Sequence, residues 1–406
     1  MAYLWYDSGM KKLEINSDIF SRGVDDIVTK EELERLLASK KQLRIKLGID
    51  ATSPDLHIGH AAPLWKIRAL QDAGHKAVII LGEFTTRIGD PTGKDATRPV
   101  LTPAMIRRNA AALKKQLGFI LRTDKAHFEF RSNAEWHGKM KEWDFLNLCS
   151  MVTHSRLIER DMFQERMKKG KEIAMTELLY PILQGYDSVA IKNDITIIGS
   201  DQLFNEHFGR FFQEKFWQSP QAIITLKILP GLDGGPKMSK SLGNYIALND
   251  TPEDKFGKAM RLLDPLIIPY LEVYTDIPAD QIARIEAELK AGMNPRDAKL
   301  IFAEKLVERY HGEQAALRAR EQFLAVFSNK KLPARIREVI VYSDNPIEIL
   351  VETKFASSKS DARRLLKQGG VEMDGKRINE KTAKIEKKSG MILRVGKRRF
   401  AILVFL

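Results

Sequence analysis

Early in the chain, the pattern of apolar and polar residues predicts a strand, a turn and a helix in succession. Apolar residues alternate through 43–49, as in a strand with one buried face, and Pro54 with Asp55 then interrupts the pattern. From Ile58 to Leu70 the apolar residues recur at helical spacing. In a parallel sheet such a junction lies at the carboxyl end of the strand, where free N–H groups of the helix attract phosphate. The pattern therefore predicts an anion site at this turn.

The same pattern continues along the chain. A helical lead-in is predicted over 13–40, and a second strand over 75–82 completes a strand–helix–strand unit. Further strands are predicted at 128–130, 195–198 and 222–229. Helices are predicted at 103–121, 143–164, 252–263, 279–291, 295–310 and 314–327. The succession of strands and helices indicates an α/β protein with a parallel sheet, followed by an all-helical segment.

The last 63 residues, 344–406, have a different character. They hold 15 Lys and Arg against 8 Asp and Glu, so this sixth of the chain carries a net +7 of the total +13. A basic helix is predicted within 357–371, a hairpin around Asp374-Gly375, and two strands within 391–405. A basic helix beside a basic hairpin suits a structured RNA, although a solvated basic face is the alternative.

Composition excludes several classes of protein. The chain has 406 residues, 44% of them apolar and 29% charged, which is enough for two or three ordinary globular domains. No run of eighteen apolar residues and no signal-peptide pattern is present, so we expect a cytoplasmic protein without a membrane segment. Cys149 is the only cysteine, which excludes an intrachain disulfide and a cysteine-rich zinc site.

Two histidines open the first predicted helix. His57 and His60 lie three residues apart, so both rings can face one ligand and donate to a phosphoryl oxygen as it gains charge. Gly59 lies between them, and without a Cβ it allows a flat base to rest on the backbone. Helix capping is the alternative reading of the pair. Neither a third histidine nor a cysteine is nearby, so we do not expect a metal site.

Polar side chains also follow the second strand. Asp90 can meet a cation there, and Lys94 and Arg98 can meet phosphate. A polar turn without function would have a similar composition. Asp201 follows the strand predicted at 195–198, a place where a carboxylate commonly binds a ribose hydroxyl.

Two further groups complete the candidate site. Tyr180, Gln184 and Asp187 have i, i+4, i+7 spacing, which places a phenol, an amide and a carboxylate on one helix face. Such a face among apolar residues is typical of a small pocket, although it could also be satisfied within the core. Lys237 and Lys240 lie in a glycine-rich loop that could close over a triphosphate and neutralise departing pyrophosphate. A solvated surface loop is the alternative.

Two of these motifs resemble the signatures of a known family. His57–His60 reads HIGH and Lys237–Ser241 reads KMSKS, in the order and at about the separation found in class I aminoacyl-tRNA synthetases. The 89–91 turn, the Tyr180 helix face and the 199–202 segment resemble tyrosyl-tRNA synthetases in particular.

The resemblance extends to the end of the chain. The tail is similar to the small RNA-binding domain, named after the fourth protein of the small ribosomal subunit, that bacterial tyrosyl enzymes carry. The family resemblance implies a Rossmann-like, doubly wound parallel sheet with a helical insertion over 1–230. The lysine loop and a helical domain on the anticodon side would follow over 231–327. The segment 328–343 is rich in Lys, Arg and Pro and is predicted to be a linker. A small α+β RNA-binding domain over 344–406 would follow it.

The family implies a tyrosine–tRNA ligase. Tyrosine attacks the α-phosphate of ATP to give tyrosyl-adenylate and pyrophosphate, and the tyrosine then passes to the 3′ end of tRNA(Tyr). Because no covalent enzyme intermediate is needed, positioning and charge stabilisation carry the catalysis. ATP would be a substrate with Mg²⁺, no metal would be tightly bound by the protein, and the enzyme would be a homodimer.

Carried over position by position, the resemblance assigns roles to residues of this chain. The ATP group consists of Asp50, Gly59, Asp201, Gln202 and Lys240. The catalytic group around the phosphates consists of Thr52, His57, His60, Lys94, Arg98, Lys237 and Lys240. The tyrosine group consists of Gly48, Asp90, Tyr180, Gln184 and Asp187, with Asp187 on the phenol. The RNA group consists of Lys359, Arg363, Arg364 and Lys367.

One departure from the family stands in the first strand. Many bacterial members have a tyrosine there that helps to bind the substrate phenol, but this chain has Lys46. A second branch of the family shares the Lys-x-Gly pattern, so Asp187 remains as the expected phenol partner. Three rival readings stay open: a tryptophanyl-tRNA synthetase, a nucleotidyltransferase of the His-x-Gly-His kind, and a noncatalytic RNA-binding protein on a synthetase scaffold.

Overall fold

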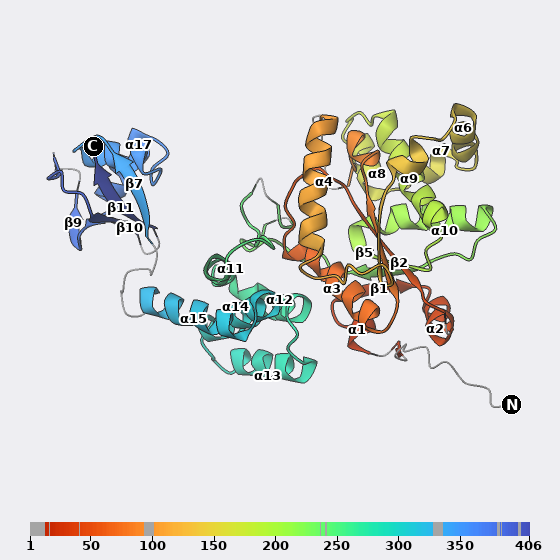
Figure 1. The fold of residues 1–406 in the computed structure, drawn as a ribbon, viewed down its shortest axis with the longest axis horizontal. Coiled ribbons are helices and arrows are strands. Elements are labelled where there is room, and N and C mark those ends of the chain that lie inside the picture. Colours follow the sequence, from red (N-terminus) through yellow and green to blue (C-terminus); the bar gives the residue numbers. More distant parts are fainter. Residues whose placement is uncertain are drawn as a thin grey trace. The chain divides into compact units, whose positions relative to one another are not determined.

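The computed structural model describes residues 13–15, 17–39, 41–92, 101–235, 237–239, 242–327, 336–379, 382, 384–396 and 399–406. The chain divides into two compact units, residues 1–316 and 317–406 (Figure 1). The first unit joins the sheet to the helices that follow it, so the boundary expected at residue 230 does not separate compact units.

A six-stranded sheet forms the centre of the first unit. Its strands are β1 Val24–Val28, β2 Arg44–Ile49, β3 Lys76–Leu81, β4 Phe128–Ser132, β5 Ile195–Gly199 and β6 Ala222–Leu226. Their spatial order is β1-β6-β5-β2-β3-β4. All neighbours are parallel except β1, which pairs antiparallel with β6. The expected Rossmann-like parallel sheet is therefore present, with one antiparallel edge strand.

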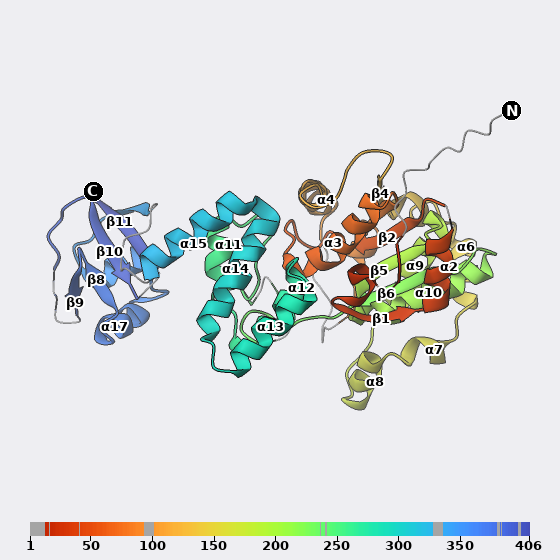
Figure 2. The ribbon, with the colours of Figure 1, turned by 90° about the horizontal axis from the view of Figure 1, so that it is seen from below.

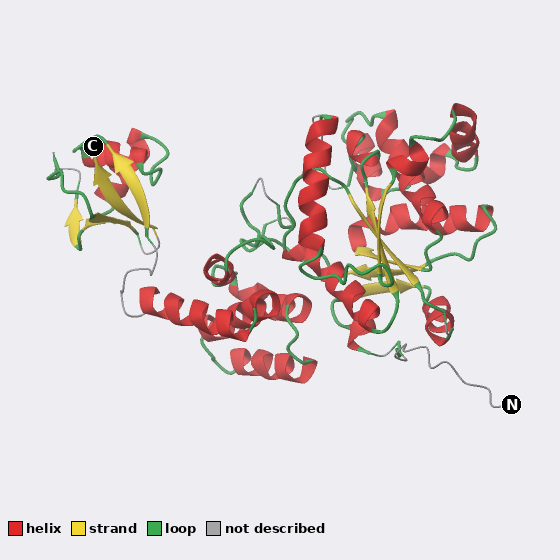
Figure 3. Ribbon diagram, in the orientation of Figure 1, coloured by secondary structure: helices red, strands yellow, loops and turns green. Residues whose placement is uncertain are grey.

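Helices cover both faces of this sheet (Figure 3). Those of the α/β part are α1 Asp18–Ser21, α2 Lys30–Ala38, α3 Ile58–Asp72, α4 Pro103–Leu117, α5 Ala134–His137, α6 Glu142–Ser150, α7 His154–Ile158, α8 Asp161–Lys168, α9 Met175–Ile191 and α10 Leu203–Lys215. The helices that follow are α11 Pro252–Ala259, α12 Ile267–Tyr274, α13 Ala279–Lys290, α14 Pro295–His311 and α15 Glu313–Phe327. Short 3₁₀ turns occur at η1 Thr85–Arg87, η2 Ser200–Gln202 and η3 Asp264–Leu266.

The strand order reverses between β2 and β5. The chain moves from β2 to β3 in one direction and from β5 to β6 in the other. Because parallel crossovers are right-handed, α3 and α10 must cover opposite faces of the sheet (Figure 2). α10 packs against α9 on its face. Ligands of doubly wound sheets bind at the carboxyl ends of the strands at this reversal. The fold therefore predicts a ligand site at the ends of β2 and β5.

Two glycines bring α9 and α10 unusually close. A Cβ at Gly185 of α9 would lie 2.7 Å from the Cβ of Phe208 on α10. A Cβ at Gly209 of α10 would lie 2.7 Å from the hydroxyl oxygen of Ser188 on α9. Real Cβ atoms do not approach other atoms so closely, and the two helices therefore depend on the missing side chains.

The predicted helical lead-in over 13–40 was wrong. β1 interrupts it, between α1 and α2. Val24 and Ile27 suggested a helical stripe, but this segment gains backbone hydrogen bonds by pairing with β6, and the hydroxyl of Thr225 accepts from the Asp26 N–H at 2.9 Å. The helix predicted over 143–164 is three short helices, and α12 was not predicted. Tertiary pairing overrode the local pattern in the lead-in.

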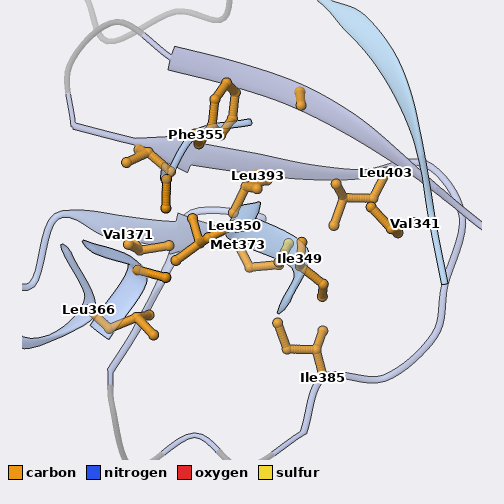
Figure 4. Close-up of a cluster of buried hydrophobic side chains, with 14 residues drawn as sticks. Val341, Ile349, Leu350, Phe355, Leu366, Val371, Met373, Ile385, Leu393 and Leu403 are labelled. Carbon is orange, nitrogen blue, oxygen red and sulfur yellow. The ribbon is translucent and has the colours of Figure 1, made fainter. Parts of the chain in front are cut away.

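The second unit contains a five-stranded sheet with two helices. Its elements after α15 are β7 Arg337–Val341, α16 Pro346–Glu352, α17 Lys359–Lys367, β8 Val371–Met373, β9 Lys376–Ile378, β10 Met391–Val395 and β11 Arg399–Phe405. The strand order is β7-β11-β10-β8-β9. The hairpin turn at Asp374-Gly375 has positive φ at both residues, as its sequence predicted. Figure 4 shows the apolar core between the sheet and the helices, which includes Leu350, Leu366 and Leu393.

The predicted linker over 328–343 needs one correction. Residues 337–341 are not linker but strand β7, which pairs parallel with β11. The Lys, Arg and Pro content of the segment suggested an extended connection, but Val341 is fully buried against the core. Residues 328–335 lie outside the described part of the chain.

Candidate active site

A cavity of about 350 Å³ lies at the carboxyl ends of β2 and β5. Its lining comes from segments that are far apart in the sequence: the β2–α3 junction, the end of β3 with the turn after it, one face of α9, the stretch from β5 to the lysine loop, and Tyr274 of α12. Thirteen residues singled out from the sequence line it, namely Gly48, Asp50, Thr52, His57, Gly59, His60, Asp90, Tyr180, Gln184, Asp187, Asp201, Gln202 and Lys237. Lys94, Arg98 and Lys240 lie outside the described residues.

The two histidines stand side by side at the start of α3. His57 is the N-cap residue, and the centroids of its ring and that of His60 are 3.8 Å apart. The Nδ1 of His60 accepts a hydrogen bond from the backbone N–H of His57 at 3.3 Å. A Cβ at Gly59 would lie 2.9 Å from the Nδ1 of His57, so only glycine fits beneath that ring. The pair therefore takes part in capping the helix and also borders the cavity.

A carboxylate and a phenol meet above β2. The hydroxyl of Tyr180 donates to Asp50 Oδ2 at 3.0 Å, and that of Thr85 donates to Asp50 Oδ1 at 2.8 Å. Burial, and then the charge of Asp50, raises the pKa of Tyr180 well above its usual range. Tyr180 therefore remains a hydrogen-bond donor at neutral pH. A Cβ at Gly82 would lie 1.9 Å from Asp50 Oδ1, so a glycine is needed there.

Asp90 belongs to a second polar group. The amide of Gln202 donates to Asp90 Oδ2 at 2.8 Å, and the backbone N–H of Thr92 donates to Asp90 Oδ1 at 3.0 Å. The guanidinium of Arg160 donates to the Thr92 hydroxyl. Gln202 was assigned with Asp201 to the adenosine part of ATP, but its amide lies against Asp90, the residue assigned to the ammonium of tyrosine. Sequence reasoning missed both Thr92 and Arg160.

Lys46, the departure from the family pattern, is completely buried. Its ammonium donates to Glu206 Oε2 at 2.6 Å and to the hydroxyl of Ser188 at 2.7 Å. Glu206 borders the cavity, and its Oε1 accepts from the amide of Gln184 at 2.9 Å. The Gln184 Oε1 in turn accepts from Asn205 at 2.8 Å, which fixes the orientation of the amide. Neither Glu206 nor Asn205 was singled out from the sequence.

Asp187 is surrounded by donors from one short segment. Its Oδ1 accepts from the indole N–H of Trp136 at 2.7 Å and lies 2.8 Å from His137 Nε2. The amide of Asn133 approaches Oδ2 at 3.5 Å. All three residues lie at or just before α5, about fifty positions away in sequence. No local pattern marked them, since their common feature is the carboxylate that they contact.

The lysine loop reaches the opposite wall. Lys237 Nζ lies 2.6 Å from Asp201 Oδ2, and the two side chains are 51% and 25% exposed. The sulfur of Met238, from the same loop, would lie 3.9 Å from a Cβ at Gly59. Lys237, which was assigned to pyrophosphate, therefore contacts Asp201, which was assigned to ribose. The loop that carries Lys237 lies next to the HIGH segment.

The basic residues of α17 are displayed on one exposed face. Lys359, Arg363, Arg364 and Lys367 are all exposed, whereas Ala362 and Leu366 of the same helix are buried in the core. Lys359 pairs with Glu348 at 2.8 Å and Arg364 pairs with Asp361 at 2.6 Å. The helix has a side-chain N-cap, because the Ser358 hydroxyl accepts from the Asp361 N–H.

Neither a metal-binding cluster nor a membrane-spanning helix is present among the described residues. Within them, no group of three or more His, Cys, Asp or Glu side chains is placed to hold a metal ion. None of the helices in the described part of the chain combines the length and apolarity that a membrane span requires.

The cavity is lined by two kinds of polar group, carboxylates and groups that can bind phosphate. Asp50, Asp90 and Asp187 can bind a cation and a hydroxyl, while His57, His60 and Lys237 can bind phosphate oxygens. Such a site suits a ligand with an ammonium group, a polar ring and an anionic group, together with a nucleotide.

Comparison with known proteins identifies the family. The family model for class I tRNA synthetases of the tryptophan and tyrosine type matches residues 38–328, and that for the C-terminal domain of tyrosine–tRNA ligases matches 334–403. The tyrosine–tRNA ligase of Thermotoga maritima is 46% identical over 94% of this chain and 95% of its own length. That of Moorella thermoacetica is 42% identical over 95% of this chain and 94% of its own length.

Solved structures share the fold. Tyrosyl-tRNA synthetase from Archaeoglobus fulgidus, solved with L-tyrosine, superposes with a TM-score of 0.59 at 22% identity and covers 76% of this chain and all of its own. Tryptophanyl-tRNA synthetase of Plasmodium falciparum reaches a TM-score of 0.56 at 17% identity, covering 75% of this chain and 84% of its own. The fold alone does not separate the two amino acids, but the relatives and the C-terminal match do. The chain therefore belongs to the tyrosyl-tRNA synthetase family of class I.

Proposed function

We propose that the cavity binds tyrosine and ATP, forms tyrosyl-adenylate, and serves the transfer of tyrosine to the 3′ end of tRNA(Tyr). One observation carries the proposal. Three separate segments, each singled out from the sequence for a different part of this reaction, line one cavity at the reversal of the strand order.

The tyrosine would lie between two groups of polar side chains. Its phenol would donate to Asp187, and its ammonium would bind at Asp90, Tyr180 and Gln184. The contacts between Asp50 and Tyr180 and between Gln202 and Asp90 add Asp50 and Gln202 to the ammonium end. Gly48 would leave room beside the ring, because nothing lies within 4 Å of a Cβ placed there.

The nucleotide would occupy the part of the cavity near the HIGH segment. Asp201 would bind the ribose, and Gly59 would face the base. A carboxylate oxygen of tyrosine would attack the α-phosphorus while the bond to the bridging oxygen of pyrophosphate breaks. Thr52, His57 and His60 would stabilise the charge that builds on the α-phosphate, and Lys237 that on pyrophosphate, each contributing about 3 kcal/mol. Lys240, Lys94 and Arg98 would assist, as the family pattern implies.

ATP would enter as its magnesium complex. The phosphates would hold the ion, as Mg²⁺ usually binds with nucleotide phosphates and water. The metal would shield the charge of the phosphates, and the protein groups would place the α-phosphate against the tyrosine carboxylate.

We also propose a cytoplasmic homodimer that binds tRNA(Tyr) through the exposed basic face of α17. Exposed apolar side chains support the dimer. Trp143 and Leu146 of α6 are 70% and 56% exposed, and Trp217 after α10 is 97% exposed. Apolar surface of this kind commonly marks a protein interface.

Exchange of labelled pyrophosphate into ATP tests the proposal when it is run with each of the twenty amino acids in turn. Tyrosine alone should support exchange, and the purified protein should then charge tRNA(Tyr). Exchange that depends on tryptophan would favour the tryptophanyl enzyme. Exchange without any amino acid would favour a nucleotidyltransferase, and its absence with all twenty would favour a noncatalytic RNA-binding protein.

A further inference from the structure

We infer that His137 is a positioning residue that holds the carboxylate of Asp187 and thereby sets the preference of the cavity for tyrosine over phenylalanine. The inference rests on the proposed function, in which Asp187 accepts the substrate phenol. His137 itself does not border the cavity and would act only through Asp187.

The geometry places His137 directly against Asp187. The distance from Nε2 to Asp187 Oδ1 is 2.8 Å, and the side chains are 1% and 7% exposed. The neighbouring Trp136 donates its indole N–H to the same oxygen at 2.7 Å. Two adjacent residues at the end of α5 therefore hold one oxygen of the carboxylate.

The other ring nitrogen defines the tautomer of His137. Its Nδ1 is buried and has no hydrogen-bond partner within the described residues. A carboxylate oxygen can only accept, so the hydrogen must be on Nε2. In the neutral ring Nδ1 then carries no hydrogen, whereas an imidazolium would bury a second N–H without an acceptor. His137 is therefore a single, fixed donor to Asp187.

The ring has little freedom to turn away. Phe84 and Tyr186 lie against it, with ring centroids 5.2 Å and 6.0 Å from its own. A donor that is held in place fixes the plane of the carboxylate that it contacts. The direction of the remaining lone pairs of Asp187 is fixed with it.

The acceptor sites of Asp187 can be counted. A carboxylate has about four, of which Trp136 and His137 occupy two on Oδ1. Asn133 approaches Oδ2 at 3.5 Å, and its amide also donates to the Thr85 hydroxyl at 3.0 Å. One site on Oδ2 is thus left for a hydroxyl in the cavity. Phenylalanine would leave that site unpaired, which is the condition for strong discrimination.

The departure at Lys46 makes this orientation more important. Lys46 is directed to Glu206 and Ser188, at 2.6 Å and 2.7 Å, and so is committed elsewhere in the wall. The phenol therefore depends on Asp187, and Asp187 depends on the α5 donors.

Two substitutions of His137 test the inference. His137→Leu removes the donor, and His137→Gln keeps an N–H at a similar reach. The measurement is kcat/KM for tyrosine and for phenylalanine in pyrophosphate exchange, together with KM for ATP and a urea unfolding curve. His137→Leu should lower kcat/KM for tyrosine by about 10- to 100-fold, mainly through KM, because one hydrogen bond to a charged group is lost. For His137→Leu, kcat/KM for phenylalanine and KM for ATP should stay within about 2-fold of wild type. His137→Gln should restore most of the wild-type kcat/KM for tyrosine.

A second background shows whether His137 acts through Asp187. In an Asp187→Asn protein, adding His137→Leu should change kcat/KM for tyrosine by less than about 2-fold, since coupled residues are not additive. His75→Leu is the matched control, because His75 is also buried but lies at the opposite end of β3. It should leave the ratio of tyrosine to phenylalanine unchanged.

Three results would overturn the inference. They are a tyrosine-to-phenylalanine ratio in His137→Leu that stays at the wild-type value although both values fall, no loss for tyrosine in His137→Leu, and a full additional loss in the Asp187→Asn background. Failure of the proposed function would look different, because the wild-type protein would then show no tyrosine-dependent exchange at all.

Discussion

Two lysine–carboxylate pairs lie in the walls of the same cavity and have the same separation. Lys46 and Glu206 are 2.6 Å apart with both side chains 1% exposed, and Lys237 and Asp201 are 2.6 Å apart with 51% and 25% exposure. The first pair is also hydrogen-bonded to Ser188 and to two glutamines, one of which is Gln184. The second lies at the edge of the glycine-rich loop.

The difference in surroundings gives the two pairs different uses. Taking both charges of Lys46 and Glu206 out of water is costly, and only a full set of hydrogen bonds offsets it, so this pair is fixed and positions Gln184. The exposed pair is weak, so under the proposed function a ribose hydroxyl would replace Lys237 at Asp201 while pyrophosphate binds Lys237. The distance between the charged atoms alone does not distinguish a fixed structural ion pair from one whose partners can be exchanged.

Breaking the buried pair should have the largest effect. Glu206→Ala leaves the ammonium of Lys46 buried without its counter-charge, and we expect the free energy of unfolding to fall by about 3–5 kcal/mol. Urea unfolding followed by circular dichroism measures the loss. The double variant Lys46→Met, Glu206→Leu should be more stable than Glu206→Ala, because no charge remains buried. A loss below about 1 kcal/mol for Glu206→Ala would contradict the role given to burial.

Breaking the exposed pair should affect catalysis and not stability. Lys237→Ala should lower kcat for tyrosine activation roughly 100-fold, since one group that stabilises transition-state charge is worth about 3 kcal/mol. Its free energy of unfolding should stay within about 0.5 kcal/mol of wild type, as for most surface changes. Lys41→Ala, which breaks an exposed pair with Asp194, is the matched control and should leave kcat unchanged. Equal losses of activity in both variants would remove the distinction.

A third lysine, Lys255, is buried without an ion pair to a carboxylate among the described residues. Lys255 donates to the carbonyls of Ala247 and Leu248, and burial lowers its pKa to about 8. Between pH 8 and 10.5 the unfolded chain binds this proton and the folded protein does not, so stability should rise with pH in that window.

The effect can be isolated with Lys255→Met. The cost of the buried charge is fully present below pH 8, so the stability of the variant relative to wild type should be about 2–3 kcal/mol more favourable at pH 7 than at pH 10. Lys290→Met, on an exposed lysine of α13, corrects for the loss of one positive charge. A relative stability that is the same at both pH values would contradict the lowered pKa.

The smallest effect is expected on the exposed basic face of α17. Arg363→Ala should weaken binding of tRNA(Tyr) and reduce the slope of log K against log salt by about 1, because one phosphate contact is lost. Filter binding over a salt series measures the slope, and tyrosine-dependent exchange should be unaffected. Lys384→Ala, an exposed lysine outside α17, is the control. An unchanged slope would place the RNA on another surface.

The sequence was most informative where chemistry follows local spacing. The β2–α3 junction, the α9 face and the lysine loop could each be predicted, because a strand end or a helical turn places their side chains together. Their meeting in one cavity followed from the parallel topology.

Contacts made only in three dimensions could not be predicted. His137 and Glu206 matter because of Asp187 and Gln184, which lie on another helix, and their own neighbours in sequence show no pattern. β1 and β7 were missed for a similar reason. Both are five-residue edge strands, and their pairing partners, β6 and β11, lie far along the chain.

The close contact of α9 and α10 limits how this enzyme could be redesigned. Gly185 and Gly209 lock the two helices into one rigid wall that carries Gln184 and Asp187 on one helix and Glu206 on the other. Under the proposed function, a larger or differently shaped amino acid could therefore not be accommodated by spreading these helices, because both ends of the substrate would lose their partners together. Engineering for unnatural tyrosine analogues has to exchange side chains within the cavity and keep both glycines.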